Sequence, residues 1–473
     1  MFDQHHSIRE AFHSQQVCRG GFLMNEPGSR RIGYEDLIRY FHEGSKPSGD
    51  LRIGGEYELF GVHAGSGVAV PYKGEGGIQS ILNRLLKNPR WAPLCEKEHL
   101  ICLLGKDSSN VTLEPGAQIE LSGAPRPTLI ELSEELKGYI RELYSVTQDL
   151  GIDFIGIGMH PVSRQEEIPF VDKCRYDIMA PYLKVKGALS HQMMKETATV
   201  QVNLDYTDEA DAMDKLRTAM GITSLVSAMF ANSPISGGRP NGFLTRREHV
   251  WMHTDPDRCG LLSFAFNEGA SFKDYLQYAL RVPMLFVVRE GKWIPMHGMR
   301  FGDFLEKGAS GLQATEEDWR LHLSTLFPEV RLKQYIEVRG VDAQSPGMVL
   351  SVPAFWKGIL YDGEARRAAW DMVRGSRFED RLKLHEEVCR MGLKARIGGK
   401  IILSMAQELV RIAKEGLRRQ GEDLRFLEPL EEMTLAQEKT PAEALLEKWE
   451  AWNHDVRKLI RYASYFHGSG WIP

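Results

Sequence analysis

The sequence predicts an α+β fold in which helices cover one face of a mainly antiparallel β-sheet and a helical region follows. Four segments alternate aliphatic and polar side chains at the two-residue period of a half-buried strand. Between them, apolar residues recur at the spacing of amphipathic helices. From about Gly363 the pattern is helical only. We therefore expect three parts: an N-terminal lead-in (1–50), a core (51–362) and a C-terminal helical region packed on the core (363–473).

Composition limits the classes of protein to which this chain can belong. Of its 473 residues, 42% are hydrophobic and 26% are charged, which is typical of a globular protein with a substantial core. A net charge of -5 argues against sequence-independent nucleic-acid binding, which needs a basic surface. The longest apolar runs are far shorter than the roughly 18 to 20 residues of a membrane span.

Cysteine spacing and the N-terminal residues bear on location. The six cysteines form no CxxC pair and no zinc-ligand pattern, so reduced thiols are expected. The N-terminal residues lack the apolar stretch of a secretory signal. We therefore expect a cytoplasmic protein without a membrane anchor.

The first predicted strand covers residues 52–60 and follows a short helix near 34–42 and a polar turn. Within it, Glu56 and Glu58 alternate with Tyr57 and Leu59, so that two carboxylates share one face. Apolar residues at helical spacing then predict a helix over 78–85.

A second acidic segment is LEPGAQIELSG, residues 113–123, which has the pattern of a β-strand. Gln118, Glu120 and Ser122 share a face, and Pro115-Gly116 predicts a turn or bulge that could aim Glu114 at the same site. An amphipathic strand with its polar face in water is the commoner meaning of such a pattern taken alone. Repetition of the pattern in other strands favours a functional face.

The middle of the chain continues the alternation of helices and strands. Thr128 and Glu131 form a capping box ahead of a helix, a buried strand is expected over 152–159, and the RYDIM segment (175–179) is placed in a loop. In the strand 198–206, Gln201, Asn203 and Asp205 face one way. A long helix is expected from about 208 to 230.

Charged residues then concentrate around one tryptophan. Residues 244–258 place Arg247 and Arg258 near Trp251 in a probable loop, for which a solvated surface loop is an equally good interpretation. Strands are expected over 260–266 and 282–288, and a helix over 319–327. The last strand, 331–340, has Tyr335, Glu337 and Arg339 on one face.

These patterns together predict a sheet face that carries five carboxylates: Glu56, Glu58, Glu114, Glu120 and Glu337. Clustered carboxylates repel one another unless cations hold them, and oxygen ligands without His or Cys suit Mg²⁺ or Mn²⁺. A sheet face that holds several such cations usually binds a nucleoside triphosphate. No GxxxxGK[ST] loop is present, so Arg247, Arg258 and Arg339 are the candidates for binding phosphate.

The order and spacing of several long motifs carry a family resemblance. They are IGGEYELF (53–60), LEPGAQIELSGAP (113–125), RYDIM (175–179), TVQVNLDY (199–206), FANSPISGGRPNGFL (230–244), HVWMHTDPDR (249–258), FPEVRLKQYIEVRGVD (327–342) and PAFWKGILYD (353–362). The chain thereby resembles the plant-type glutamate–cysteine ligase family, which also occurs in bacteria. The resemblance covers residues 50–362 and implies a curved antiparallel sheet like that of the glutamine synthetase catalytic domain.

The resemblance also implies a reaction. ATP would phosphorylate the γ-carboxylate of glutamate, and the amine of cysteine would attack to give γ-glutamylcysteine, the first step of glutathione synthesis. The implied partners are these small molecules, with no nucleic acid and no membrane, and the expected assembly is a monomer or homodimer. A ligase of the same fold that uses another amine, and a non-catalytic relative, are the alternatives.

Roles follow by matching positions to the family's motifs. The five glutamates match acidic metal-binding positions, and Arg339 would stabilise the transferring phosphoryl group. Arg258, which falls in a substrate-binding loop with Arg247 and Trp251, is the second candidate catalytic residue. The implied substrate-binding residues are Arg247, Trp251, Gln201, Asn203, Tyr335 and Gln118. The family usually has Thr and His where this chain has Gly55 and Tyr57, Lys at Leu59, and a basic residue at Gln334. Tyr57 and Leu59 are expected to face away from the carboxylates.

Overall fold

The computed structural model describes residues 32–467 and 471. The first 31 residues of the predicted lead-in, Cys18 among them, therefore lie outside the described residues. The helix expected near 34–42 is confirmed as α2, Tyr34–His42. The other five cysteines are free thiols in this structure.

One large sheet organises the described part of the chain, with the strand order β14-β15-β7-β1-β5-β4-β3-β2 and with β6 paired to β1. All its pairings are antiparallel, which confirms the predicted α+β class. Its strands are β1 (Ile53–His63), β2 (Trp91–Glu96), β3 (His99–Gly105), β4 (Asn110–Leu113), β5 (Ile119–Ser122), β6 (Ile152–Ile155), β7 (Val200–Leu204), β14 (Val330–Leu332) and β15 (Ile336–Val338). Short two-stranded pairs are β8 (Ile235–Ser236) with β9 (Arg239–Pro240), β10 (Cys259–Gly260) with β13 (Phe327–Pro328), β11 (Phe286–Arg289) with β12 (Lys292–Pro295), and β16 (Arg396–Ile397) with β17 (Lys400–Ile401).

Helices cover the aliphatic face of this sheet. Helix α4 contacts β1, α12 contacts β1 and β7, and α7 contacts β14 and β15. Tyr57 and Leu59 point into the hydrophobic core on this face, as the strand period predicted. The helices before residue 363 are α2, α3 (Ile78–Leu85), α4 (Leu129–Thr147), α5 (Cys174–Lys186), α6 (Ser190–Glu196), α7 (Glu209–Met229), α8 (Arg246–Met252), α9 (Phe272–Arg281), α10 (Phe301–Lys307), α11 (Glu316–Leu323) and α12 (Ser351–Leu360).

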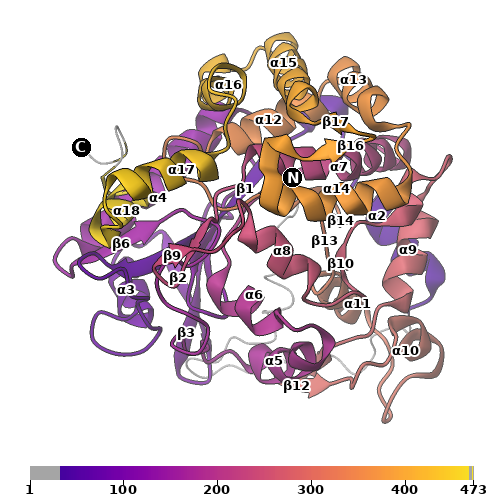
Figure 1. Cartoon of the computed structure of the whole chain (residues 1–473). Coiled ribbons are helices and arrows are strands. Elements are labelled where there is room, and N and C mark those ends of the chain that lie inside the picture. The colour runs from indigo at the N-terminus through magenta and orange to yellow at the C-terminus, as the bar shows by residue number, and fades with distance from the viewer. Residues whose placement is uncertain (1–31, 468–470, 472–473) are drawn as a thin grey trace.

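The C-terminal helices pack against the core helices, at the top of the molecule in Figure 1. Helices α13 and α14 contact α7, α15 contacts α12, and α18 contacts β6. The interface of α12 with α15 is very close, because Gly416 faces the backbone of Gly358 and Gly358 faces the backbone of Ala413. The helices are α13 (Gly363–Val373), α14 (Phe378–Met391), α15 (Leu403–Gln420), α16 (Glu428–Glu431), α17 (Pro441–Ala451) and α18 (Val456–Ala463).

Several expected elements differ from the structure. RYDIM lies in helix α5, and residues 246–252 of the predicted 244–258 loop form helix α8, whose first turn is capped by the Thr245 hydroxyl. Helix α8 is short, and α5 contains Pro181 and spreads its apolar residues around the helix, so hydrophobic periodicity did not reveal them. Residues 263–266 form a 3₁₀ helix instead of a strand, and only the end of the 282–288 run, in β11, is a strand. The sequence of a short apolar run does not decide between strand and helix, because tertiary contacts determine which one forms.

Two predicted strands are hairpins. In residues 113–123, β4 and β5 flank a turn in which Ala117 has a φ of +68°, as the Pro115-Gly116 turn signal indicated. Residues 331–340 likewise form β14 and β15. This second turn places Arg331 directly opposite Glu337, a pairing that a single strand does not give.

Candidate functional site

The carboxylate face is the polar face of strands β1, β5, β7 and β15, and strand register determines its geometry. Glu58 on β1 pairs with Glu120 on β5. On the other side of β1, Glu56 pairs with Gln201 of β7, and Glu337 of β15 pairs with Asn203 of β7. Because cross-strand partners have Cβ atoms about 5 Å apart, the sheet brings these acids together.

Three of these carboxylates have raised pKa values. Burial and the charges of Glu337 and Glu120 raise the pKa of Glu56 to about 7. Burial and the charge of Glu114 raise the pKa of both Glu58 and Glu120. The protein therefore supplies too little positive charge for these acids, which is the condition that a bound cation corrects.

Glu337 is different because three cations surround it. It is fully buried, and ion pairs join it to Arg331 at 2.5 Å, Lys333 at 3.1 Å and Arg339. Burial alone would raise the pKa of Glu337, but these charges hold it well below its usual range. Its two oxygens are already engaged, so a metal would have to compete with these ion pairs.

The β4–β5 turn contributes the remaining acid. Glu114 lies partly exposed at the start of this turn, and its amide donates to the Gln118 carbonyl at 2.9 Å. Gln118 donates through Nε2 to the Thr197 carbonyl at 2.8 Å. Its Oε1 is buried without a hydrogen-bond partner and is therefore an oxygen that remains free for a ligand.

Two amides of β7 lie between the acids. Asn203 donates to Glu56 at 2.8 Å, and Gln201 makes a long contact with Glu58 at 3.5 Å. The Glu58 carboxylate also accepts the Thr199 amide at 2.9 Å. The Oδ1 atom of Asn203 is buried and unpaired. These amides hold the carboxylate side chains in one orientation.

Trp251 of α8 brings two of the predicted arginines together. The guanidinium carbons of Arg247 and Arg339 lie 5.6 and 5.7 Å from its ring centre. Arg247 donates through Nη2 to the Arg339 carbonyl at 2.9 Å, while its Nε and Nη1 are buried without hydrogen-bond partners. Arg339 itself bonds to Glu337 and Gln201, which joins this arginine pair to the carboxylate face.

The structure does not bring Arg258 to these groups. Arg258 is fully buried, and its side chain donates to Asp255 at 2.6 Å and to the carbonyls of Thr325 and Pro283. These are contacts that fix the loop after α8, so they give no support to the predicted catalytic role. Tyr335 is partly buried and accepts a hydrogen bond from Lys333 at 3.0 Å.

Arg331 and Lys333 are site residues that the sequence did not reveal. Both were assigned to one strand with Glu337, where neither would surround its carboxylate. A hairpin signal at Lys333–Tyr335 could have shown them, but the turn lacks Gly, Asn and Pro.

The donor set of the carboxylate face fits a hard divalent cation. Glu56, Glu58, Glu114 and Glu120 offer carboxylate oxygens, and the unpaired oxygens of Gln118 and Asn203 add neutral donors. This oxygen-only chemistry suits Mg²⁺ or Mn²⁺ better than Zn²⁺, which prefers His and Cys ligands.

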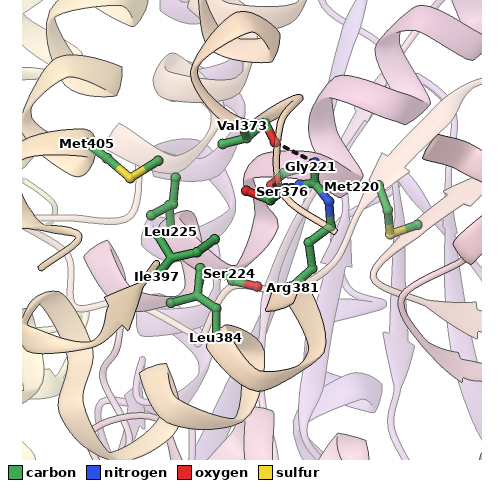
Figure 2. A pocket seen from close by; sticks show the side chains of 10 residues that line it. All are labelled: Met220, Gly221, Ser224, Leu225, Val373, Ser376, Arg381, Leu384, Ile397 and Met405. Atoms are coloured by element: carbon green, nitrogen blue, oxygen red, sulfur yellow. Dashed lines mark hydrogen bonds between the residues drawn. The ribbon is translucent and has the colours of Figure 1, made fainter. Parts of the chain in front are cut away.

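A cavity in the described residues lies elsewhere, between α7 and the C-terminal helices. Figure 2 shows Arg381 crossing it to bond the carbonyls of Val373 and Gly221. Its volume is about 10 Å³, room for about one water molecule. None of the carboxylates lines it, so it is not a substrate site.

Comparison with known proteins shows the family. Residues 52–461 match the model of glutamate-cysteine ligase family 2 (GCS2). The chloroplastic glutamate–cysteine ligase of Medicago truncatula is 40% identical over 425 residues, which cover 88% of this chain and 82% of that protein. That of Arabidopsis thaliana is 39% identical over 437 residues, covering 91% and 83%.

Two solved structures share the fold. A glutamate–cysteine ligase from Francisella tularensis in complex with AMP has a TM-score of 0.52 at 14% identity and covers 89% of this chain and 90% of its own. A bifunctional glutathione synthetase from Pasteurella multocida has a TM-score of 0.51 at 13% identity and covers 92% of this chain and 54% of its own. These neighbours agree with the predicted ligase-type fold.

The relatives correct the predicted location. We expected a cytoplasmic protein, but the similar plant proteins are named chloroplastic, so the relatives contradict that expectation. The cysteine spacing behind that expectation separates reducing from oxidising compartments and cannot distinguish cytoplasm from plastid. Within residues 32–467, no helix combines the length and apolar character of a membrane span.

Proposed function

This chain belongs to glutamate-cysteine ligase family 2, and we propose that its carboxylate face carries out the family's ATP-dependent ligation of glutamate to cysteine. The observation that carries the assignment of this site is the cluster of Glu56, Glu58 and Glu120 on adjacent strands, all with raised pKa values. Burying clustered carboxylates without neutralising cations costs folding free energy, so their presence favours a function that depends on a bound cation. The product is γ-glutamylcysteine, the first intermediate of glutathione synthesis.

The reaction has two steps. An oxygen of the glutamate γ-carboxylate attacks the γ-phosphorus of ATP, and ADP leaves. The amine of cysteine then attacks the γ-carbonyl carbon, the carbon–oxygen bond to phosphate breaks, and the amine loses a proton. Both steps build negative charge on phosphoryl oxygens, so preorganised positive groups are the main means of catalysis.

Glu56, Glu58, Glu114 and Glu120 would hold Mg²⁺, which when bound neutralises phosphate charge. Glu337 would bind the metal only if the side chain of Arg339 or Lys333 moved away from its carboxylate toward the phosphate. In the structure described here, Glu337 fixes those cations at the edge of the face. Asn203 and Gln201 orient the neighbouring carboxylates.

The arginine pair would bind the anionic groups of the substrates. Arg247 has two buried nitrogens, Nε and Nη1, that donate no hydrogen bond, and guanidinium groups capture carboxylates in a bidentate manner. We assign Arg247 and Trp251 to the α-carboxylate of glutamate. Arg339, bonded to Glu337, would stabilise the transferring phosphoryl group.

The assignment is tested by mixing purified protein with ATP, Mg²⁺, glutamate and a panel of amines and measuring ADP release. Cysteine is expected to give the highest kcat/KM, with a γ-glutamylcysteine product identified by mass. ADP release that does not depend on glutamate would contradict the assignment. The alternative, another acceptor amine, is not favoured by the relatives and would show as a different best substrate in the panel.

A further inference from the structure

A buried charged cluster lies behind the substrate-binding arginine. It consists of Glu248 on α8, Glu329 between β13 and β14, and His385 on α14, and we call it the Glu–Glu–His cluster. All three side chains are buried, and one ligand atom from each lies within 4.8 Å of the other two. His385 Nε2 lies 2.9 Å from a Glu248 oxygen and 3.7 Å from a Glu329 oxygen. Its Nδ1 contacts the Ser224 hydroxyl of α7 at 3.0 Å.

The cluster joins the C-terminal region to the substrate site. Helix α8 contacts both α6 and α14 (Figure 1), so that His385 approaches Glu248 from a helix far along the chain. Arg247 precedes Glu248, and its Nη1 lies 3.6 Å from a Glu248 oxygen. The Glu329 carbonyl accepts the Arg339 amide at 3.0 Å. Arg247 therefore contacts the cluster through its side chain, whereas Arg339 is linked to Glu329 through the backbone.

The charge state of the cluster decides where Arg247 can point. Burial lowers the pKa of His385, but the two glutamates outweigh it and raise that pKa to about 10. Burial raises the pKa of Glu329, but hydrogen bonding and the charge of His385 hold it low. Burial and Glu329 raise the pKa of Glu248 to about 7. An imidazolium therefore balances the charge of the two glutamates at ion-pair distance. Among the described residues, His385 Nε2, both Glu248 oxygens, and Nε and Nη1 of Arg247 are buried without a hydrogen-bond partner.

We propose that His385 is a positioning residue, which occupies Glu248 and Glu329 so that Arg247 remains free to bind the glutamate substrate. The proposal rests on the assignment of Arg247 to that substrate. Without the imidazolium, Glu248 would draw the Arg247 guanidinium 3.6 Å away into a hydrogen-bonded ion pair. The C-terminal helical region thus contributes to substrate binding through α14, in addition to covering the core.

The nearness of Arg247 argues against a metal in this cluster. A metal ligand must be a neutral imidazole, whereas the two carboxylates beside His385 raise its pKa to about 10 and favour the imidazolium. A guanidinium already stands on the other side of Glu248. A metal is nevertheless an outcome that the experiment below can detect.

The test compares His385→Gln, Glu248→Gln and the double variant by steady-state kinetics with glutamate varied. In His385→Gln we expect the KM for glutamate to rise about tenfold or more while kcat changes little, because uniform binding is lost. In the double variant the KM should return toward the wild-type value, since no Glu248 carboxylate remains to capture Arg247. His322→Gln is the matched control: His322 is equally buried but bonds the Ala279 carbonyl, so its KM should be unchanged.

An unchanged KM in His385→Gln, with only the melting temperature lowered, would overturn the proposal. The proposal would also be overturned if the wild-type protein kept one equivalent of bound metal after chelation and His385→Gln did not. If that variant does not fold, the wild type and Glu248→Gln are compared between pH 8 and 10.5. The KM should rise more in the wild type; equal profiles would reject the role of Glu248. Loss of glutamate-dependent ADP release in the wild type itself would instead reject the assigned function.

Discussion

Glu58 and Glu120 stand directly opposite one another on the adjacent antiparallel strands β1 and β5, and no cationic side chain of the described residues lies within salt-bridge distance of either. Like charges in this position destabilise a sheet. This pair is retained at a cost in stability that only a ligand-dependent function explains, and it gives the most direct test of the site.

Glu120→Gln should stabilise the metal-free protein and abolish its activity. Removing one charge of the pair is expected to gain about 1 kcal/mol, whereas the loss of a metal ligand should lower kcat/KM on the order of 100-fold. Thermal unfolding without Mg²⁺ and ADP release with Mg²⁺ measure the two effects. Glu142→Gln, at a carboxylate that binds Asn88 and Trp91, is the control and should retain activity. Full turnover in Glu120→Gln would remove this residue from the site.

The pH dependence of stability should report on Glu56. Its folded pKa of about 7 lies above the ordinary 4.5, so the folded state binds a proton more tightly than the unfolded chain. Wild type should therefore lose stability relative to Glu56→Gln as pH rises from 4.5 through 7, by at most about 3 kcal/mol. Denaturant unfolding of both proteins at several pH values measures this difference in stability. The buried histidines are the same in both proteins, so their contribution to the pH dependence cancels. Saturating Mg²⁺ should flatten the profile; a constant difference would mean that Glu56 titrates normally.

Metal removal should separate catalysis from folding. With a chelator, ADP release should fall to background while the circular dichroism of the helices stays largely intact, because the core helices pack on the opposite face of the sheet. Added Mg²⁺ should restore the activity. Wholesale loss of the helical signal would show that the ions are structural.

Gly55 and Tyr57 should be energetically coupled. The Tyr57 ring covers Gly55 so closely that a Cβ at residue 55 would overlap it. The family resemblance pairs Thr with His at these two positions, which suggests that both departures compensate each other. We expect Gly55→Thr alone to cost about 1–3 kcal/mol and the added Tyr57→His to recover about 1 kcal/mol or more of it. Strictly additive unfolding free energies for the single and double variants would exclude this coupling.

The close crossing of α12 and α15 predicts that a glycine-to-alanine substitution at this crossing lowers stability, although the same substitution usually raises it. Gly→Ala in an exposed helix normally stabilises by roughly 0.5–1 kcal/mol. At Gly416 a Cβ would strike the Gly358 backbone, so Gly416→Ala should destabilise by about 1–3 kcal/mol. Gly138→Ala in α4, where a Cβ meets nothing within 4 Å, is the matched control and should stabilise. Thermal melts of both variants measure the signs, and stabilisation at both positions would contradict the close packing.

The predicted division into a core and a C-terminal helical region remains a prediction. The family match runs through both parts, from 52 to 461, and His385 of the second part reaches Glu248, the neighbour of Arg247, in the first. The oligomeric state, a monomer or homodimer, is likewise a prediction that sedimentation of the purified protein would settle.

The sequence alone determined the class of the fold and the acids of the carboxylate face. Strand alternation is a local property, so Glu56, Glu58 and Glu120 could be placed on polar faces without knowledge of strand order. The long motifs identified the family for the same reason, since they lie within continuous segments.

Tertiary structure decided which groups meet. Arg331 reaches Glu337 only because the chain turns at 333–335, and His385 reaches Glu248 only because α14 packs against α8. Local patterns carry no record of such contacts between distant segments. Arg258 shows the reverse case, in which a residue that the sequence made a candidate for binding phosphate is enclosed by Asp255 and backbone carbonyls. Burial and charge pairing depend on neighbours from the whole chain, and they decide whether an arginine binds substrate or holds a loop.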